Sequence, residues 1–192
     1  MFVVLEGLDG AGTTTQVERL SRAWSDREVL VTREPTGGPV GRIIRQVLGA
    51  DPDAPRMESL PWLFAADRSD HLFRTVEPAL ARGATVVSDR YYHSSLAYQS
   101  LTMPLEQVAA LNRFRAPDLT VFLDVPVDVC LERIGRRGGP REIYERRDRL
   151  QRIAEAYEAV LDLVMARGEH VVRLDGTRSP EAVHNAILDA AR

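Results

Sequence analysis

The residues best suited to chemistry stand near the start of the chain, where an apolar run at 2–5 gives way to a glycine-rich segment. In chain order, this segment contains Gly7, Leu8, Asp9, Gly10, Ala11, Gly12, Thr13, Thr14 and Thr15. Glycines let the backbone turn tightly enough to direct several N–H groups inward, and a following helix adds the positive end of its dipole. A strand, a glycine loop and a helix start in this order predict a cradle for polyphosphate.

The spacing of this loop fits the phosphate-binding pattern GxxxxGK[ST], with Gly7 and Gly12 as its two glycines and Thr14 at the hydroxyl position that binds Mg²⁺. Thr13, however, stands where the pattern has lysine. All 25 basic residues are arginines, so no other lysine can replace it and an arginine has to supply the charge. A glycine-rich strand-to-helix turn without a ligand is the alternative interpretation.

Length and composition limit the kinds of protein that this chain can be. It has 192 residues, 44% of them hydrophobic, which suits one domain over 1–192 with a full core. The net charge of −3 gives no chain-wide basic field, so we expect no nucleic-acid partner. Cys130 is the only cysteine, which excludes an internal disulfide and fits a reducing, cytoplasmic location.

Hydrophobic periodicity predicts strands that alternate with helices, which favours a parallel sheet covered on both faces. Strands are expected at 2–5, 29–32, 85–88, 119–126 and 171–174. Helices are expected around 14–25, 40–47, 59–81, 105–115, 129–134, 153–164 and 180–190. The short polar-aromatic stretch 92–99 receives no element. Apolar runs stay well below the roughly 18 residues of a membrane span, and no charged leader precedes the first strand, so we expect no membrane segment.

Polar residues follow two of these strands. An Arg-Glu-Pro sequence at 33–35 follows the second strand, and an Asp-Arg pair at 89–90 follows the third. Ligand crevices of open parallel sheets lie at the carboxyl ends of the strands, so both groups should border the phosphate cradle. Between 133 and 149 the chain carries seven arginines with glycines and a proline among them. This composition predicts a mobile, arginine-rich lid at about 135–149.

Taken together, these motifs resemble the thymidylate kinases, a family of P-loop nucleoside monophosphate kinases. The resemblance covers nearly the whole chain and rests on the segments 6–12, 32–35, 64–68, 89–91, 94–99, 117–118 and 133–149. It implies an α/β fold of the P-loop NTPase type, with a five-stranded parallel sheet, helices on both faces and an arginine-rich lid. It also implies transfer of the γ-phosphoryl group from ATP to dTMP with Mg²⁺, in a homodimer.

The same resemblance implies which residues bind ATP and carry the chemistry. Those implied for ATP are the loop residues 7–15 and Arg137. Those implied for the metal are Thr14 and Asp89, and those implied for catalysis are Asp9, Arg90 and Arg141. Phosphoryl transfer needs positive charge on the transferring oxygens. We therefore expect the lid to replace the absent lysine, with Arg141 helped by Arg137 or Arg146.

A second set of residues is implied for dTMP. It consists of Arg33, Glu34, Pro35, Phe64, Arg68, Arg90, Ser95, Tyr98, Gln99 and Tyr157. By this resemblance Phe64 stacks on thymine and Arg68, one helical turn later, reaches a base carbonyl. Arg90 holds the dTMP phosphate, Tyr98 excludes a 2′-hydroxyl, and Tyr157 closes the pocket.

Several of these residues fit structural roles as well. Phe64 could belong to the core with Arg68 as a solvated neighbour, and Asp9 or Asp89 could cap a turn. The helical spacing of Tyr157 fits a core position, and the lid arginines could form a solvated helix face. Two other functions also stay open: a relative that binds dTMP without turnover, and a kinase for another nucleotide such as dCMP or dUMP.

Overall fold

Five strands form one parallel sheet in the computed structural model, which describes residues 1–138 and 142–192. The strands are β1 (Phe2–Gly7), β2 (Val29–Arg33), β3 (Thr85–Asp89), β4 (Leu119–Asp124) and β5 (Val171–Asp175). Their order across the sheet is β2-β3-β1-β4-β5, and every neighbouring pair is parallel. The five-stranded parallel sheet is thus confirmed, and each strand overlaps the apolar run that predicted it.

The burial of the strands explains why continuous apolar runs predicted them. Every residue of β1 is buried, and so is β4 up to its last residue, because both strands lie inside the sheet with helices on each side. The edge strands β2 and β5 are partly exposed. The register pairs Asp89 of β3 with Leu5 of β1 and with Arg33 of β2, so the carboxyl ends of these strands meet.

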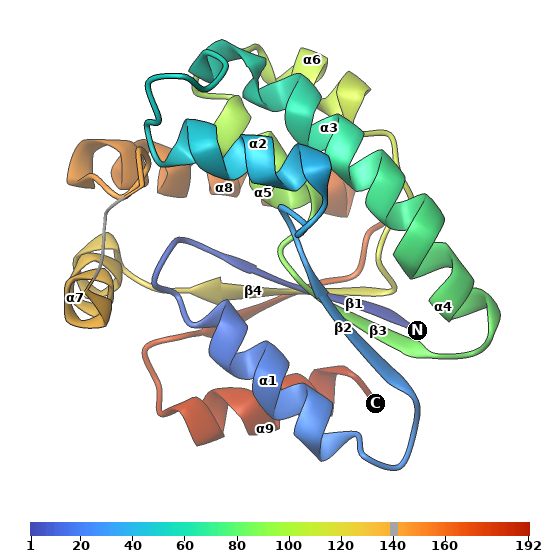
Figure 1. Cartoon of the computed structure of the whole chain (residues 1–192). Coiled ribbons are helices and arrows are strands. Elements are labelled where there is room, and N and C mark those ends of the chain that lie inside the picture. The colour runs from blue at the N-terminus through green and yellow to red at the C-terminus, as the bar shows by residue number, and fades with distance from the viewer. Residues whose placement is uncertain (139–141) are drawn as a thin grey trace.

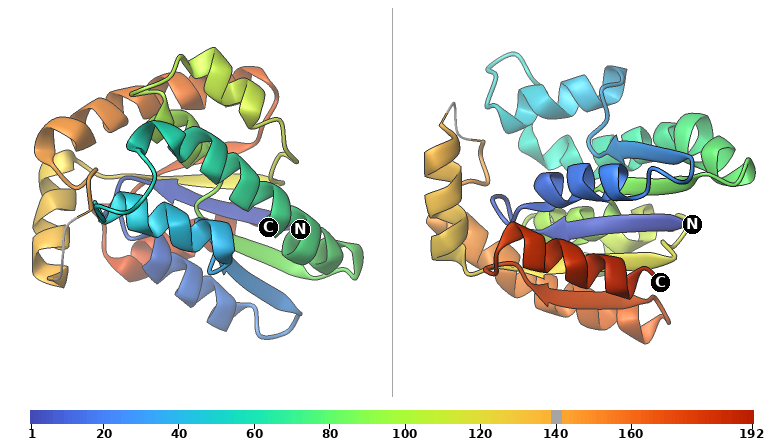
Figure 2. Two further views of the ribbon diagram at one scale, coloured as in Figure 1. Left: turned by 45° about the horizontal axis from the view of Figure 1, so that its top comes forward. Right: turned by 90° about the horizontal axis from the view of Figure 1, so that it is seen from below.

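Helices cover both faces of the sheet, as expected (Figures 1 and 2). On one face α1 (Thr13–Ala23) packs beside α9 (Pro180–Ala190). On the other, α5 (Tyr92–Gln99) packs against β1 and α8 (Arg147–Ala166) against α5. The remaining α-helices of the described residues are α2 (Pro39–Leu48), α3 (Leu60–His71), α4 (Glu77–Ala81), α6 (Leu105–Leu111) and α7 (Val127–Arg137). In Figure 1, α7 stands at the end of the sheet opposite both termini.

The helix expected at 59–81 is not a regular α-helix throughout. A 3₁₀ turn, η1 (Met57–Ser59), precedes α3, and a π-helix, η2 (Leu72–Val76), joins α3 to α4. The Glu77 N–H donates to the Leu72 carbonyl, one residue further back than in an α-helix. Pro78 near the start of α4 has no N–H, and its ring would clash with a carbonyl of a regular helix, which favours the wider turn. The apolar spacing of the sequence does not reveal this wider turn.

Two further segments differ from the expectation. The helix expected at 105–115 ends at Leu111, because the Asn112 side chain is engaged elsewhere. Its Nδ2 donates to the Val108 carbonyl at 2.8 Å and its Oδ1 accepts from Arg68. The stretch 92–99, to which the sequence assigned no element, forms α5. Seven of its residues are buried, so it has no polar face that would make its helical period visible.

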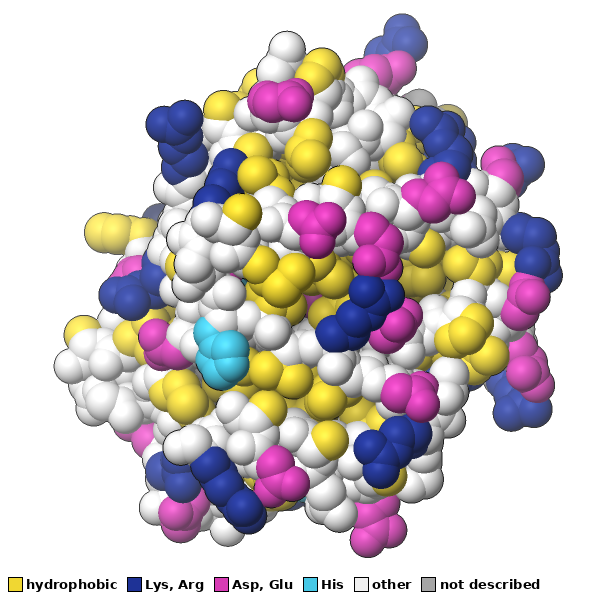
Figure 3. Space-filling view, turned by 180° about the vertical axis from the view of Figure 1, so that it is seen from behind, with side chains coloured by type: hydrophobic (Ala, Val, Ile, Leu, Met, Phe, Trp, Pro, Cys, Tyr) yellow, Lys and Arg dark blue, Asp and Glu magenta, His cyan; other side chains and the backbone are white. Residues whose placement is uncertain are grey.

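The surface carries charges of both signs. Figure 3 shows arginine and acidic side chains interspersed with hydrophobic ones over the face behind the view of Figure 1. Among the residues that the structure describes, no helix is both long enough and apolar enough to cross a membrane. Cys130 is buried in α7.

Candidate active site

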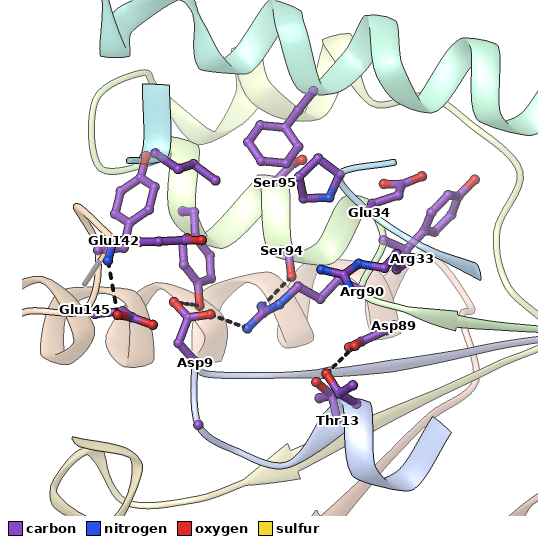
Figure 4. Close-up of a pocket in the computed structure, with 18 of the residues that line it drawn as sticks. Asp9, Thr13, Arg33, Glu34, Asp89, Arg90, Ser94, Ser95, Glu142 and Glu145 are labelled. Atoms are coloured by element: carbon purple, nitrogen blue, oxygen red, sulfur yellow. Dashed lines mark hydrogen bonds and ion pairs between the residues drawn. The ribbon is translucent and has the colours of Figure 1, made fainter. Parts of the chain in front are cut away.

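A cavity of about 430 Å³, a size that suits a small ligand, opens at the carboxyl ends of β1, β2 and β3. Its walls come from the glycine loop, the ends of β2 and β3, helices α3 and α5, and the segment that follows α7 (Figure 4). The expected site residues that line it are Asp9, Gly10, Gly12, Thr13, Thr14, Thr15, Arg33, Glu34, Pro35, Phe64, Arg68, Asp89, Arg90, Ser95, Tyr98, Gln99 and Arg137. The fold therefore brings most of the expected residues to one place.

The glycine loop between β1 and α1 has the shape of an anion cradle. Gly10 and Gly12 have φ angles of 85° and 102°, in the left-handed region that favours glycine. A Cβ at Gly10 would lie 2.6 Å from the Cys130 carbonyl oxygen, so α7 approaches too closely for any side chain there. Gly12 precedes α1, whose first residues line the cavity and whose first N–H groups have no partner within the helix.

Arg133 fastens this loop from behind. Its Nη1 donates to the Ala11 carbonyl at 3.1 Å and its Nη2 to the Gly176 carbonyl at 3.0 Å. Arg133 is the first arginine of the arginine-rich segment. Its hydrogen bonds connect α7 to the glycine loop and to the turn after β5. Gly7, Leu8 and Ala11 are buried behind the loop and do not line the cavity, which differs from their expected contact with ATP. Their place is explained by the apolar core that the loop covers.

Thr14 and Asp89 meet where α1 begins and β3 ends. The Thr14 hydroxyl donates to Asp89 Oδ2 at 2.5 Å. The other carboxylate oxygen, Oδ1, is buried and has no hydrogen-bond partner among the described residues. A hydroxyl and a carboxylate with an unpaired oxygen are the hard ligands that Mg²⁺ prefers, so the pair fits this ion. The described residues contain no cluster of three or more His, Cys, Asp or Glu that could hold a metal ion.

Arg90 projects into the cavity with its guanidinium group fixed on one side (Figure 4). Nη1 donates to the Gly7 carbonyl and the Ser94 hydroxyl, each at 2.9 Å, and Nη2 donates to Asp9 Oδ1 at 2.7 Å. Burial alone would lower the pKa of Arg90, but the electrostatic effects of Tyr98 and Asp9 outweigh it and raise that pKa well above its ordinary value. The described residues supply no partner for Nε, so this edge of the charged group is free for an anion.

Asp9 connects Arg90 to the wall formed by α5. Its Oδ2 accepts a hydrogen bond from the Tyr98 hydroxyl at 3.1 Å. Burial, and to a smaller extent Asp9, raise the pKa of Tyr98 well above its ordinary value, so the phenol stays protonated and donates. The Arg90 guanidinium also lies 5.4 Å from the centre of the Tyr98 ring, within cation–π distance. The three side chains thus hold one another in place.

Phe64 and Arg68 lie one turn apart on α3, and both line the cavity. Phe64 is partly exposed, whereas Arg68 is only 1% exposed. Arg68 donates from Nε to Glu34 Oε2 at 2.8 Å, from Nη2 to the Ser95 hydroxyl at 2.9 Å, and from Nη1 to Asn112 Oδ1. Arg68 is therefore a charged group built into the cavity wall, and the alternative in which it is a solvated neighbour is wrong.

The remaining wall residues differ in exposure. Gln99 is 1% exposed, and its Oε1 has no partner among the described residues although the side chain lines the cavity. The Glu34–Pro35 peptide bond is cis. Arg33 is exposed and lines the cavity beside them. The resemblance implied all four residues for dTMP, and all four line the same cavity.

Comparison with known proteins assigns the family. A family model described as thymidylate kinase matches residues 5–187. The chain belongs to the thymidylate kinase family. A thymidylate kinase of Bifidobacterium longum is 40% identical, over 97% of this chain and 95% of that protein. A probable thymidylate kinase of Thermococcus kodakarensis is 36% identical, over 98% and 95%, and one of Halorubrum lacusprofundi is 38% identical, over 95% and 93%.

One residue implied by likeness to the thymidylate kinases lies elsewhere. Tyr157 was expected to close the pocket, but its side chain is fully buried and does not line the cavity. Its hydroxyl donates to Glu6 Oε2 at 3.0 Å, and its ring packs 5.0 Å from the Phe122 ring. The helical spacing that also fitted a core position gives the correct placement, because α8 turns this side chain toward the sheet.

The arginine-rich segment of this thymidylate kinase family member is only partly described. Arg141 lies outside the described residues. Arg137 lines the cavity and pairs at 2.5 Å with Glu145, which is 2% exposed. Arg146 instead pairs with a solvent-exposed aspartate and does not line the cavity. Of the two arginines considered beside Arg141, the structure places Arg137 at the site.

Sequence reasoning assigned no site role to eight of the residues that line the cavity: Arg45, Leu48, Tyr91, Ser94, Arg133, Glu142, Tyr144 and Glu145. Arg45 on α2 donates from Nη2 to the Pro35 carbonyl at 2.5 Å. The only sequence feature that could have indicated Arg45 is its place on the polar side of that helix. Glu142 stands among the lid arginines, for which a solvated helix face was only the alternative interpretation, and burial is the main cause that raises its pKa. Tyr144 is 4% exposed and meets the Tyr98 ring edge-on at 5.1 Å. No apolar period in the sequence predicts this position.

Proposed function

We propose that this protein transfers the γ-phosphoryl group of ATP to dTMP, giving ADP and dTDP. The observation that carries the proposal is the position of Arg90 between the glycine loop and the nucleoside wall. Its guanidinium group is anchored to Gly7 and Asp9 and keeps Nε for a ligand, which suits a phosphate held between two nucleotides. Membership of the thymidylate kinase family supports the same reaction.

The acceptor site would recognise dTMP by shape and by hydrogen bonds. Phe64 offers a partly exposed aromatic face for thymine, and Arg68 keeps one Nη1 hydrogen beyond those it uses in the wall. The unpaired Oε1 of Gln99 can accept the N3–H of thymine, which cytosine lacks. Tyr98, held by Asp9, occupies the place where an added 2′-hydroxyl would clash, which favours deoxyribose.

On the ATP side, the glycine loop and the first N–H groups of α1 would cradle the phosphates. Thr14 and Asp89 would hold Mg²⁺, which when bound neutralises charge on the phosphate oxygens. Arg137, together with Arg141, is our choice for the positive charge that Thr13 does not provide. The reaction needs no side-chain base, because the attacking phosphate oxygen is already ionised near neutral pH.

Two further properties are part of this proposal. A homodimer packed through helices is supported by exposed aromatic side chains, Trp62 on α3 at 54% and Phe73 on η2 at 79%. Light scattering of the wild type and of Phe73→Glu tests it: a dimer that dissociates in the variant supports the interface, and a monomeric wild type rejects it. The single free thiol supports a cytoplasmic location.

A coupled assay for ADP release tests the proposed reaction, with Mg·ATP as donor and dTMP, dUMP or dCMP as acceptor. We expect turnover with dTMP to exceed turnover with either alternative. A higher kcat/KM for dUMP or dCMP would show a different acceptor. Measurable dTMP binding without ADP release at high enzyme concentration would instead identify a binding protein that does not catalyse the transfer.

A further inference from the structure

Glu6 is a fully buried carboxylate next to the glycine loop, and the proposed reaction does not use it. It is the penultimate residue of β1 and is 0% exposed. A buried carboxylate is unfavourable unless hydrogen bonds or a nearby charge compensate it. The partners that compensate Glu6 lie largely in the segment that begins with Arg90.

The first contact fixes the main chain beside Arg90. Arg90 has a φ of 72°, a left-handed conformation that residues with a side chain keep only where their surroundings hold them. The Arg90 N–H donates to the Leu5 carbonyl at 2.9 Å, and the next N–H, that of Tyr91, donates to Glu6 Oε1 at 2.8 Å. Bonds on both sides of Arg90 thus hold its backbone, and Glu6 accepts one of them.

The second contact orients the Arg90 guanidinium group through Ser94. The Ser94 hydroxyl donates to Glu6 Oε2 at 2.6 Å, and the Ser94 N–H donates to Oε1 at 3.2 Å. A serine hydroxyl has one hydrogen, so a bond to Glu6 leaves only lone pairs toward Arg90. Those lone pairs accept from Arg90 Nη1 at 2.9 Å. The charge on Glu6 therefore determines which way the serine hydroxyl points.

We propose that Glu6 is a positioning residue for Arg90, which it holds through the Tyr91 N–H and the Ser94 hydroxyl in the orientation that binds the dTMP phosphate. This inference rests on the proposed function. Glu6 touches no reacting atom, and its effect reaches the substrate only through the guanidinium group. Its loss should therefore weaken recognition of the phosphate and spare recognition of the nucleoside.

Glu6→Gln keeps the side-chain shape but places an NH₂ group against hydrogen-bond donors. Isothermal titration calorimetry would compare binding of dTMP with binding of thymidine, which lacks the phosphate. We expect the Kd for dTMP to rise about tenfold or more, by displacement of Arg90, and the Kd for thymidine to stay within about twofold. The KM for dTMP should rise by more than the KM for ATP. An equal loss for dTMP and thymidine, or no loss for either, would overturn the inference.

Glu169→Gln is a matched control. Its side chain is 8% exposed, and its carboxylate bonds to His93 Nε2 at 3.0 Å, on the side of that ring away from Glu6. It should lower stability in the way that loss of a buried charge does and leave both Kd values unchanged. If the wild type binds thymidine and dTMP with equal affinity, or binds neither ligand, the proposed function fails. If the wild type prefers dTMP but Glu6→Gln does not weaken dTMP binding more than thymidine binding, the inference alone fails.

A second variant covers the case in which Glu6→Gln does not fold. Ser94→Ala removes the hydroxyl contact and keeps the main chain, and we expect a smaller loss of dTMP affinity with thymidine affinity preserved. In an Arg90→Ala background, Ser94→Ala should change the Kd for dTMP no further, because both act through the same contact. Independent, multiplicative effects of the two substitutions would contradict positioning through Arg90.

Discussion

Glu34 and Arg68 form an ion pair inside the protein, with Oε2 and Nη2 2.7 Å apart and the side chains 2% and 1% exposed. The pair joins the residue after β2 to α3, and it forms part of the wall proposed for thymine. The other carboxylate oxygen of Glu34 lies 3.0 Å from His71 Nδ1. This wall is therefore built from charged groups that compensate one another, and removing one of them should affect both stability and recognition.

Replacing Arg68 with methionine should lower the free energy of unfolding by about 3–5 kcal/mol, because it leaves the Glu34 carboxylate buried beside a single partner. The same change should reduce the preference for dTMP over dCMP, because it removes the donor proposed for the base carbonyl. Urea denaturation measures the first effect and the ratio of kcat/KM values the second. Stability close to the wild type would contradict the first prediction, and an unchanged ratio the second.

Two further variants separate these effects. Arg74→Met removes an arginine from η2 whose pair with Asp70 is exposed, so unfolding should remain close to the wild type. The double variant Arg68→Met/Glu34→Gln removes both charges of the buried pair. It should recover part of the stability and none of the acceptor preference.

Thr14→Ala should raise the Mg²⁺ concentration needed for half-maximal turnover by about tenfold, because it removes one of the oxygens proposed to hold the ion. Thr14→Ser keeps the hydroxyl and should lie between the alanine variant and the wild type. Activity measured against Mg²⁺ at saturating ATP checks both values. An identical Mg²⁺ requirement in all three proteins would remove Thr14 from the metal site.

The parts of the fold that depend on a simple period were predictable. β1 and β4 are apolar on both faces because both faces are covered, so continuous apolar runs identified them. The π-helix η2 could not be predicted, because a single wider turn changes the apolar spacing of the long helical region very little. Helix α5 was missed for the opposite reason: it is buried almost all round and has no polar face.

The site was predictable where residues follow a strand or a loop of known shape. Gly10, Thr14, Asp89 and Arg90 reach one cavity because parallel strands end together. Glu6 could not be assigned, because an acidic residue at the end of a buried strand gives no sign of its partners in a distant helix. Tyr157 was misplaced for a related reason, since likeness to a family carries no information on which way a helix faces in this chain.

The Cys130 thiol should resist modification in the folded protein. Burial is the main cause that raises its pKa from 9.0 to about 11. Because the pKa is higher in the folded state, the contribution of the thiol to stability is present below about pH 9 and lost as the pH rises from 9 to 11. The stability difference between the wild type and Cys130→Ala should therefore shrink over this range. Rapid reaction with a thiol reagent at pH 8 without denaturant would contradict the buried position.

Thr13→Lys should raise kcat about tenfold or more, because an ammonium group at this position places positive charge beside the transferring phosphate oxygens. One such donor can stabilise the transition state by roughly 3 kcal/mol. Thr13 is the first residue of α1, is 6% exposed and lines the cavity, so a longer side chain there can reach into the site. Ala23→Lys adds a lysine at the exposed end of the same helix and should leave kcat unchanged.

The Thr13→Lys variant also tests whether a lid arginine supplies the positive charge of the absent lysine. If Arg137 supplies the charge that the loop lacks, Arg137→Ala should cost more in the wild type than in the Thr13→Lys background, where the ammonium group shares the task. Steady-state kinetics of the four proteins in this cycle give the coupling between the two positions. Equal losses in the two backgrounds would show that Arg137 acts independently of the loop. An unchanged kcat in Thr13→Lys would show that the loop position does not limit the rate.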